Sequence, residues 1–136
     1  MADRLHSAAI RLLRTVRETD RAMGLSGPRA SALSVVVFKG PLTMGALAAA
    51  EQVKPPTMTR LVAALERQGL VTRAADPADG RVQIIRATAR GRAVLQAGRR
   101  RRVARIAEML QGLPAGDRQV LDRAADLIRT MSNQRD

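Results

Sequence analysis

The chain has 136 residues, 46% of them hydrophobic, a formal net charge of +12, no cysteine, and Phe38 as its one aromatic residue. This is one domain's worth of sequence, and its aliphatic, alanine-rich apolar set favours a mainly helical core. The composition excludes disulfides, thiol chemistry and cysteine-ligated metals, and it lacks the aromatic platforms that bind single-stranded RNA. With no apolar run near the ~18 residues of a membrane span and no secretory signal, we expect a cytoplasmic protein without membrane contact.

The first part of the chain has the pattern of three helices. They are predicted over residues 3–23, 28–38 and 44–51. The segment from Gly24 to Pro28 breaks the first helix, because glycine and proline disfavour helical continuation. Thr43 is a suitable N-cap for the short third helix, and Leu47 and Ala50 are expected to face inward from it.

A fourth helix, predicted over residues 55–68, has both of its ends marked. Proline at Pro55 suits the first helical turn, and Gly69 stands where a left-handed C-terminal cap belongs. The predicted buried stripe consists of Met58, Leu61, Val62 and Leu65. The opposite face holds Pro56, Thr57, Thr59, Arg60, Ala63 and Arg67. That face is small, hydroxylated and basic, as a helix entering the major groove of DNA requires.

The surroundings of this helix indicate a winged helix-turn-helix. A short helix, the tight connection at 52–54 and a longer helix form the helix-turn-helix arrangement. Strands predicted over 70–73 and 82–88 enclose a turn-rich segment and form a hairpin with a basic tip, which is a wing. Thr88 can cap a long helix over 89–111, and Pro114 separates it from a last helix over 115–131.

The positive charge is concentrated in the middle of the chain. Residues 1–53 carry 7 basic and 4 acidic groups, whereas residues 54–102 carry 12 basic and 3 acidic groups. Residues 103–136 carry 5 of each and are neutral. A basic sector on a neutral scaffold is typical of a polyanion binder, although an arginine-rich surface that is merely solvated remains the alternative.

At this point the chain resembles the MarR family of bacterial transcription regulators. The matching segments are Gly40-Pro41-Leu42-Thr43, Leu47-Ala48, 53–62, 65–71, the wing segment Asp76-Pro77-Ala78-Asp79-Gly80-Arg81, and Thr88 with Gly91. They cover essentially the whole chain in order. The pairing of Pro-Pro-Thr-x-Thr-Arg with Asp-Pro-x-Asp-x-Arg at this spacing is specific, since either motif alone is weak.

The resemblance implies a mainly α, single-domain protein of residues 1–136. Its winged helix-turn-helix part would span 28–88, and residues 1–23 and 89–136 would form a helical dimerisation layer. It further implies a homodimer that binds a palindromic operator, in most relatives as a repressor, without a cofactor. Effectors of such proteins are often anionic, lipophilic small molecules that bind between the two layers and release the DNA.

The candidate DNA-contacting residues fall on the fourth helix. We predict base-edge contacts from Pro56, Thr57, Thr59 and Arg60, where Arg60 can pair bidentately with guanine and a threonine methyl can touch thymine. Lys54 and Arg67 suit phosphates and would position the protein on the duplex. For Thr57, bonding of its hydroxyl to the local backbone is an equally good interpretation.

The remaining candidates are all arginines, with one carboxylate. Arg81 at the wing tip is predicted to enter the minor groove, with Asp79 orienting its guanidinium, although a solvated loop arginine is the alternative. The run 99–102 spreads around a helix and is interpreted as solvated. As a further hypothesis, one arginine of this run, or Arg11 or Arg14 on the first helix, faces an effector carboxylate.

Other functional classes fit the sequence less well. An enzyme is not expected, because His6 is alone near a terminus and no phosphate-loop, dinucleotide or serine-nucleophile motif is present. No acidic cluster has metal-ligand spacing, so no metal site is predicted. A sequence-indifferent architectural DNA-binding protein is the principal alternative, and a winged helix that binds only proteins is a third possibility.

Overall fold

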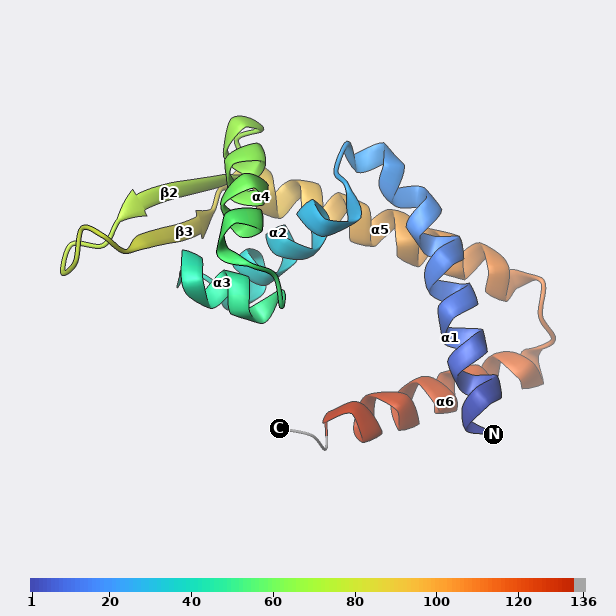
Figure 1. The fold of residues 1–136 in the computed structure, drawn as a ribbon. Helices are drawn as coiled ribbons and strands as arrows, with labels where there is room; N and C mark the ends of the chain where they lie inside the picture. The colour runs from blue at the N-terminus through green and yellow to red at the C-terminus, as the bar shows by residue number, and fades with distance from the viewer. Residues whose placement is uncertain (134–136) are drawn as a thin grey trace. The chain divides into compact units, whose positions relative to one another are not determined.

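The computed structural model describes residues 1–133 as a mainly helical fold with one small antiparallel sheet (Figure 1). In chain order the elements are α1 (Ala2–Arg17), the 3₁₀ helix η1 (Glu18–Met23), α2 (Gly27–Lys39), β1 (Leu42–Thr43), α3 (Met44–Ala50), α4 (Pro55–Arg67), β2 (Val71–Ala75), β3 (Gln83–Ala87), α5 (Ala89–Gln111) and α6 (Ala115–Asn133). The chain divides into two compact units, Met1–Arg102 and a C-terminal unit that begins at Val103. The winged helix-turn-helix elements α2 to β3 all lie in the first unit.

The boundary between the two units lies inside α5, between Arg102 and Val103. The reason is the packing of the first half of α5. Its buried residues Gly91, Leu95 and Gly98 lie on one face and pack within the first unit. The N-terminal part of α5 therefore belongs structurally to the winged helix-turn-helix.

The predicted helices are confirmed, with one difference at the N-terminus. The helix expected over 3–23 is α-helical only to Arg17 and continues as η1. The hydroxyl of Thr19 donates to the carbonyl of Val16 at 2.7 Å, a local side-chain bond of the kind that competes with regular helix. Gly24, with φ +66°, then ends the segment, as glycine can adopt the left-handed region without a steric penalty.

Helix α4 begins and ends where the sequence predicted. Pro55 and Pro56 occupy its first turn after Lys54. At the other end Gly69 has φ +70°, its N–H donates to the carbonyl of Glu66 at 2.9 Å, and the next N–H donates to the carbonyl of Leu65 at 3.0 Å. These two bonds form a Schellman cap, which satisfies the last carbonyls and turns the chain sharply into β2.

The core of the first unit lies between α2, α3, α4 and the sheet. Its fully buried large side chains are Leu33, Leu47, Met58, Leu65, Ile85, Val36, Val62 and Val71. On α4 these include three of the four residues of the predicted stripe, and Leu61 is partly buried. Because this face is removed from water, the opposite face of α4 is the one available to a partner.

Two expectations about α3 and the sheet require correction. Ala50 is exposed, whereas Ala48 is buried at 3% exposure, because α3 turns Leu47 and its C-terminal neighbour toward α2 and α4.

The sheet has a third strand, β1, which pairs Leu42 with Ile85 of β3 in the order β1-β3-β2. A two-residue strand has no periodicity of its own and exists only through this pairing. The predicted N-cap is confirmed, since Thr43 Oγ1 accepts the N–H of Ala46 at 3.0 Å.

The start of α5 is anchored directly to the end of α4. Thr88 Oγ1 donates to the carbonyl of Gly69 at 2.7 Å and accepts the N–H of Gly91 at 3.0 Å. A Cβ at Gly91 would lie 2.1 Å from the carbonyl oxygen of Leu70, so only glycine allows this approach. The recognition-type helix, the hairpin and α5 are therefore joined at one point.

Candidate nucleic-acid interface

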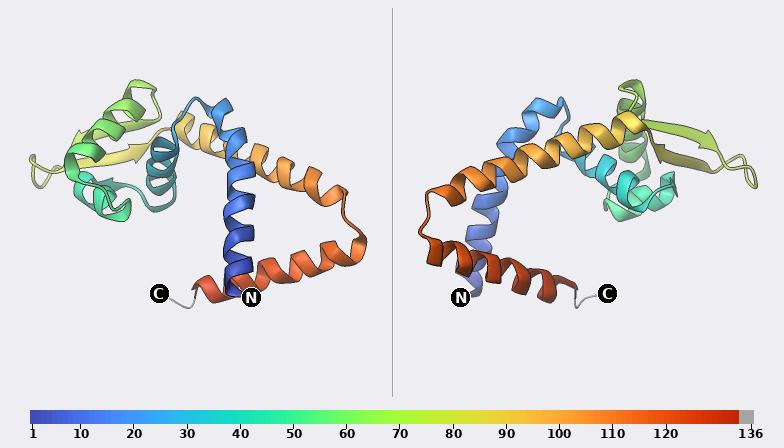
Figure 2. Two further views of the ribbon diagram at one scale, coloured as in Figure 1. Left: turned by 45° about the vertical axis from the view of Figure 1, so that its right-hand side comes forward. Right: turned by 180° about the vertical axis from the view of Figure 1, so that it is seen from behind.

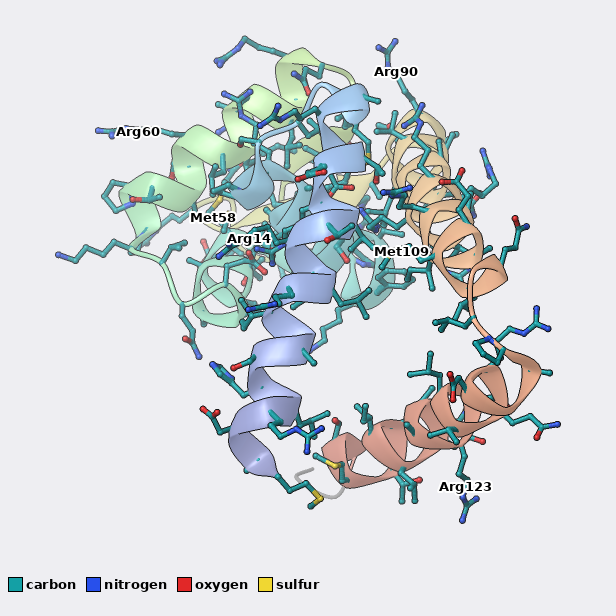
Figure 3. The ribbon with its side chains drawn as sticks, turned by 90° about the vertical axis from the view of Figure 1, so that its right-hand side faces the viewer. Arg14, Met58, Arg60, Arg90, Met109 and Arg123 are labelled. Carbon is teal, nitrogen blue, oxygen red and sulfur yellow. The ribbon has the colours of Figure 1, made fainter. Side chains whose placement is uncertain are left out.

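The outward face of α4 and the residue before it, Lys54, carry all of the predicted recognition residues. Lys54, Pro56, Thr57, Thr59, Arg60 and Arg67 are all exposed. Figure 3 shows the Arg60 side chain extending away from α4 on the side opposite Met58, which has no exposed surface. Helix α4 thus has one face that packs into the core and an opposite face that is exposed to solvent.

The two threonines of this face differ in how their hydroxyl groups are used. Thr59 Oγ1 donates to the carbonyl of Pro55 at 3.0 Å. Its proton is committed to the backbone, so toward a partner it offers only its oxygen as an acceptor and its methyl group. The backbone-bonded interpretation considered for Thr57 therefore applies to Thr59, two residues later.

The wing is the hairpin of β2 and β3, which extends beyond the helices of the first unit in both views of Figure 2. Its turn is shaped by two aspartates. Asp76 Oδ1 accepts the N–H of Ala78 at 2.7 Å, and Asp79 Oδ1 accepts the N–H of Arg81 at 3.0 Å. Arg81 is exposed at the tip.

Asp79 makes a different contact from the one expected of it. Its carboxylate bonds the backbone of Arg81, and no ion pair with the Arg81 guanidinium occurs among the described residues. An N–H two residues away is already within reach in a turn, whereas holding a long arginine side chain costs rotamer entropy. Asp79 therefore sets the conformation of the tip and leaves the guanidinium free.

Sequence reasoning missed three arginines around this interface. Arg73 on β2 pairs with Glu66 of α4, with Nη2 and Oε2 3.2 Å apart, and so ties the wing to the helix. Arg86 of β3 and Arg90 at the start of α5 are exposed. All three lie in the basic sector 54–102, whose charge was the one signal that could have indicated them.

The comparisons with known proteins agree with this arrangement. A sequence model of the MarR family matches residues 23–82. The HTH-type transcriptional regulator Mb0904 of Mycobacterium bovis is 37% identical over 98% of this chain and 94% of its own length. The chain belongs to the MarR family. This MarR protein is therefore a DNA-binding, winged helix-turn-helix transcriptional regulator.

Solved structures give the same fold. The transcriptional regulator Tm0710 of Thermotoga maritima matches with a TM-score of 0.82 and 27% identity, covering 98% of this chain and 94% of that chain. CouR from Rhodococcus jostii RHA1, solved with bound p-coumaroyl-CoA, matches with a TM-score of 0.63 and 26% identity, covering 93% and 87%.

A cavity of about 950 Å³ lies beside the helix-turn-helix of this MarR protein, within the first unit. Its wall is formed by the end of α1, η1, the first half of α2, the turn between α3 and α4, and α5. Of the arginines proposed to meet an effector, Arg102 lines it, whereas Arg11 and Arg14 do not. Arg17 and Arg21 also line it and are exposed.

The four arginines at 99–102 point in different directions around α5, so their environments differ. The first three arginines of this run are exposed, and Arg102 is partly buried at the cavity.

Within residues 1–133 no group of histidine, cysteine and carboxylate side chains could hold a metal ion. In the same part of the chain no helix is long and apolar enough to cross a membrane.

The wing tip of this MarR protein can be tested separately from α4. Replacing Arg81 by alanine is expected to lower operator affinity by about 1–3 kcal/mol, because a narrow minor groove concentrates negative potential. Titration of labelled operator DNA at moderate salt measures the loss. Arg129, an exposed arginine on α6, provides the control, since its replacement removes the same charge far from the wing in sequence. Unchanged binding of the Arg81 variant would remove this residue from the interface.

Proposed function

We propose that this protein is a repressor that binds a palindromic operator as a homodimer and releases it when a small anionic, lipophilic effector binds. The observation that carries the DNA part is the outward face of α4. A helix whose other face is buried in the core presents two threonines and two arginines to solvent, beside a wing whose Arg81 guanidinium is in no ion pair among those of the described residues. Base edges are read from α4 and phosphates are contacted by Lys54 and Arg67.

Unburied apolar side chains support the homodimer. On α1, Leu5, Ile10, Leu12 and Leu13 are between 41% and 47% exposed. On α6, Val120, Leu121, Leu127, Ile128 and Met131 are between 42% and 67% exposed. Apolar surface of this extent on helices marks a protein interface. A second copy of the chain is the partner proposed for it, because most soluble oligomers are homo-oligomers with closed symmetry.

The cavity supports the effector part of the proposal. It is lined by apolar residues such as Leu25, Val35 and Leu95 and by the cationic Arg17, Arg21 and Arg102. An apolar wall with a few arginines suits a lipophilic anion. Binding of p-coumaroyl-CoA by the similar CouR is consistent with a ligand site in this protein.

Selection of duplex DNA from a random pool tests the proposal. We expect a palindrome whose half-sites are about one helical turn apart, because a dimer with twofold symmetry places two α4 helices in successive major grooves. The selected duplex should bind ~10³-fold more tightly than random duplex, and affinity should fall steeply with salt through counterion release. Equal affinity for random duplex would favour the architectural alternative, and a flat salt response would count against DNA binding.

A further inference from the structure

One ion pair lies at the wall of the cavity. Arg102 Nη1 on α5 is 2.6 Å from Asp20 Oδ1 on η1, across 82 positions of sequence. Their side chains are 29% and 22% exposed, less than in the other ion pairs of the described residues. Charged hydrogen bonds partly withdrawn from water are stronger than exposed ones. This pair is therefore a firm link between η1 and α5.

A second contact holds η1 on the same face of α5. Arg102 follows Gly98 by four residues and so continues the stripe of buried residues on that helix. A Cβ at Gly98 would lie 2.0 Å from Met23 Sδ, so the absence of a side chain lets Met23 of η1 settle against α5. Met23 provides the apolar part of the attachment and Asp20 the ionic part.

We infer that Asp20 is a built-in competitor for the anion-binding group of this cavity. The guanidinium of Arg102 is the most shielded cation of the wall, and in the free protein a carboxylate of the chain itself occupies it. An organic carboxylate binds Arg102 by displacing Asp20, whereas a neutral molecule of the same shape leaves the pair intact. The inference rests on the effector site proposed above and specifies how that site is regulated.

The cavity that contains the Asp20–Arg102 pair also borders the start of α4, the helix proposed to read DNA. Glu51 and Val53, in the turn that immediately precedes α4, line the same cavity. The N–H of Val53 donates to the carbonyl of Ala48 at 3.0 Å and so fixes this turn on α3. A ligand that displaces Asp20 and fills the cavity would also contact the residues that set the start of α4. By linkage, anion binding and operator binding then weaken each other by the same factor.

Replacing the competitor tests the inference. Asp20→Asn keeps the shape of the side chain and removes its charge, so salicylate, used as the probe, should bind about fivefold or more tightly than it binds the wild type. Arg102→Gln should abolish salicylate binding in either background. Salicylamide, the neutral counterpart, should show no gain with Asp20→Asn. Isothermal titration calorimetry measures all of these affinities. Failure of Asp20→Asn to bind salicylate more tightly than the wild type overturns the inference.

Glu108→Gln is the matched control. Glu108 pairs with Arg105 on α5 in an exposed i,i+3 arrangement and does not line the cavity, so its loss changes the net charge equally. Salicylate affinity should be unchanged. An equal gain in the Asp20 and Glu108 variants would reduce the effect to net charge and overturn the inference.

A second measurement leaves the ion pair intact, in case Asp20→Asn does not fold. The chain has no cysteine, so a nitroxide label on Ala22→Cys reports the motion of η1 alone. Salicylate should increase the mobility of this label and salicylamide should not. Unchanged mobility on saturation with salicylate overturns the inference. Neither measurement uses DNA. Failure of the wild-type protein to select a specific duplex would therefore contradict the proposed function, and it would leave the inference about Asp20 unaffected.

Discussion

Replacing Arg60 by alanine is expected to cause the largest loss of operator binding among single substitutions on α4. Arg60 is exposed, has no ion pair among those of the described residues, and extends from the helix into solvent. A bidentate contact with guanine contributes about 1–3 kcal/mol, and the proposed homodimer would make it twice, so operator affinity should fall by about 2–6 kcal/mol. Titration of the selected operator measures this loss.

A conservative variant separates base reading from charge. Arg60→Lys keeps the positive charge but loses the planar fork, so discrimination at one base pair should relax while the salt dependence stays close to that of the wild type. Thermal unfolding of both variants should match the wild type within about 0.5 kcal/mol, since the residue is on the surface. Retention of full operator affinity by Arg60→Ala would place base reading elsewhere on α4.

Replacing Met58 by alanine is expected to have the largest effect on folding. Met58 lies two residues before Arg60 on the buried face and has no exposed surface. Removing a fully buried methionine leaves a cavity and should cost about 2–5 kcal/mol of unfolding free energy, a large share of the stability of a small domain. Urea unfolding followed by circular dichroism measures it.

Met58→Leu is the control, because a swap of similar volume should cost less than about 1.5 kcal/mol. At temperatures where Met58→Ala remains folded, its operator affinity should approach that of the wild type. A loss of affinity without a loss of stability would mean that Met58, and not only the outward face, takes part in recognition. Arg60→Ala and Met58→Ala therefore separate the contribution of α4 to operator affinity from its contribution to the free energy of unfolding.

The recognition helix was predictable because its determinants are local. Proline in the first turn, glycine after the last turn and a stripe at helical spacing are all contained within residues 55–69, and the structure places the helix at Pro55–Arg67. The wing strands were predictable for a similar reason, since Asp76 and Asp79 bond their own turn and leave the flanking residues to pair. The exposed basic face follows from the buried one, because an amphipathic helix that buries its apolar stripe leaves the residues opposite that stripe in solvent.

Features that depend on distant residues could not be read from the pattern. β1 exists because Leu42 meets Ile85, and no local signal in two residues could indicate it. Ala48 is buried in place of Ala50 because the direction of a short helix is set by its neighbours.

The sequence by itself determined the family, the order of the α-helices and of the two wing strands, and the exposed basic face of α4, because caps, spacing and charge act over a few neighbouring residues. Only the tertiary structure decided which arginine of the run at 99–102 meets the cavity. Arg102 is selected because the stripe of Gly91, Leu95 and Gly98 orients α5 and because Asp20, 82 positions away in sequence, lies opposite it. Such a pairing arises from packing between elements, which no local pattern encodes.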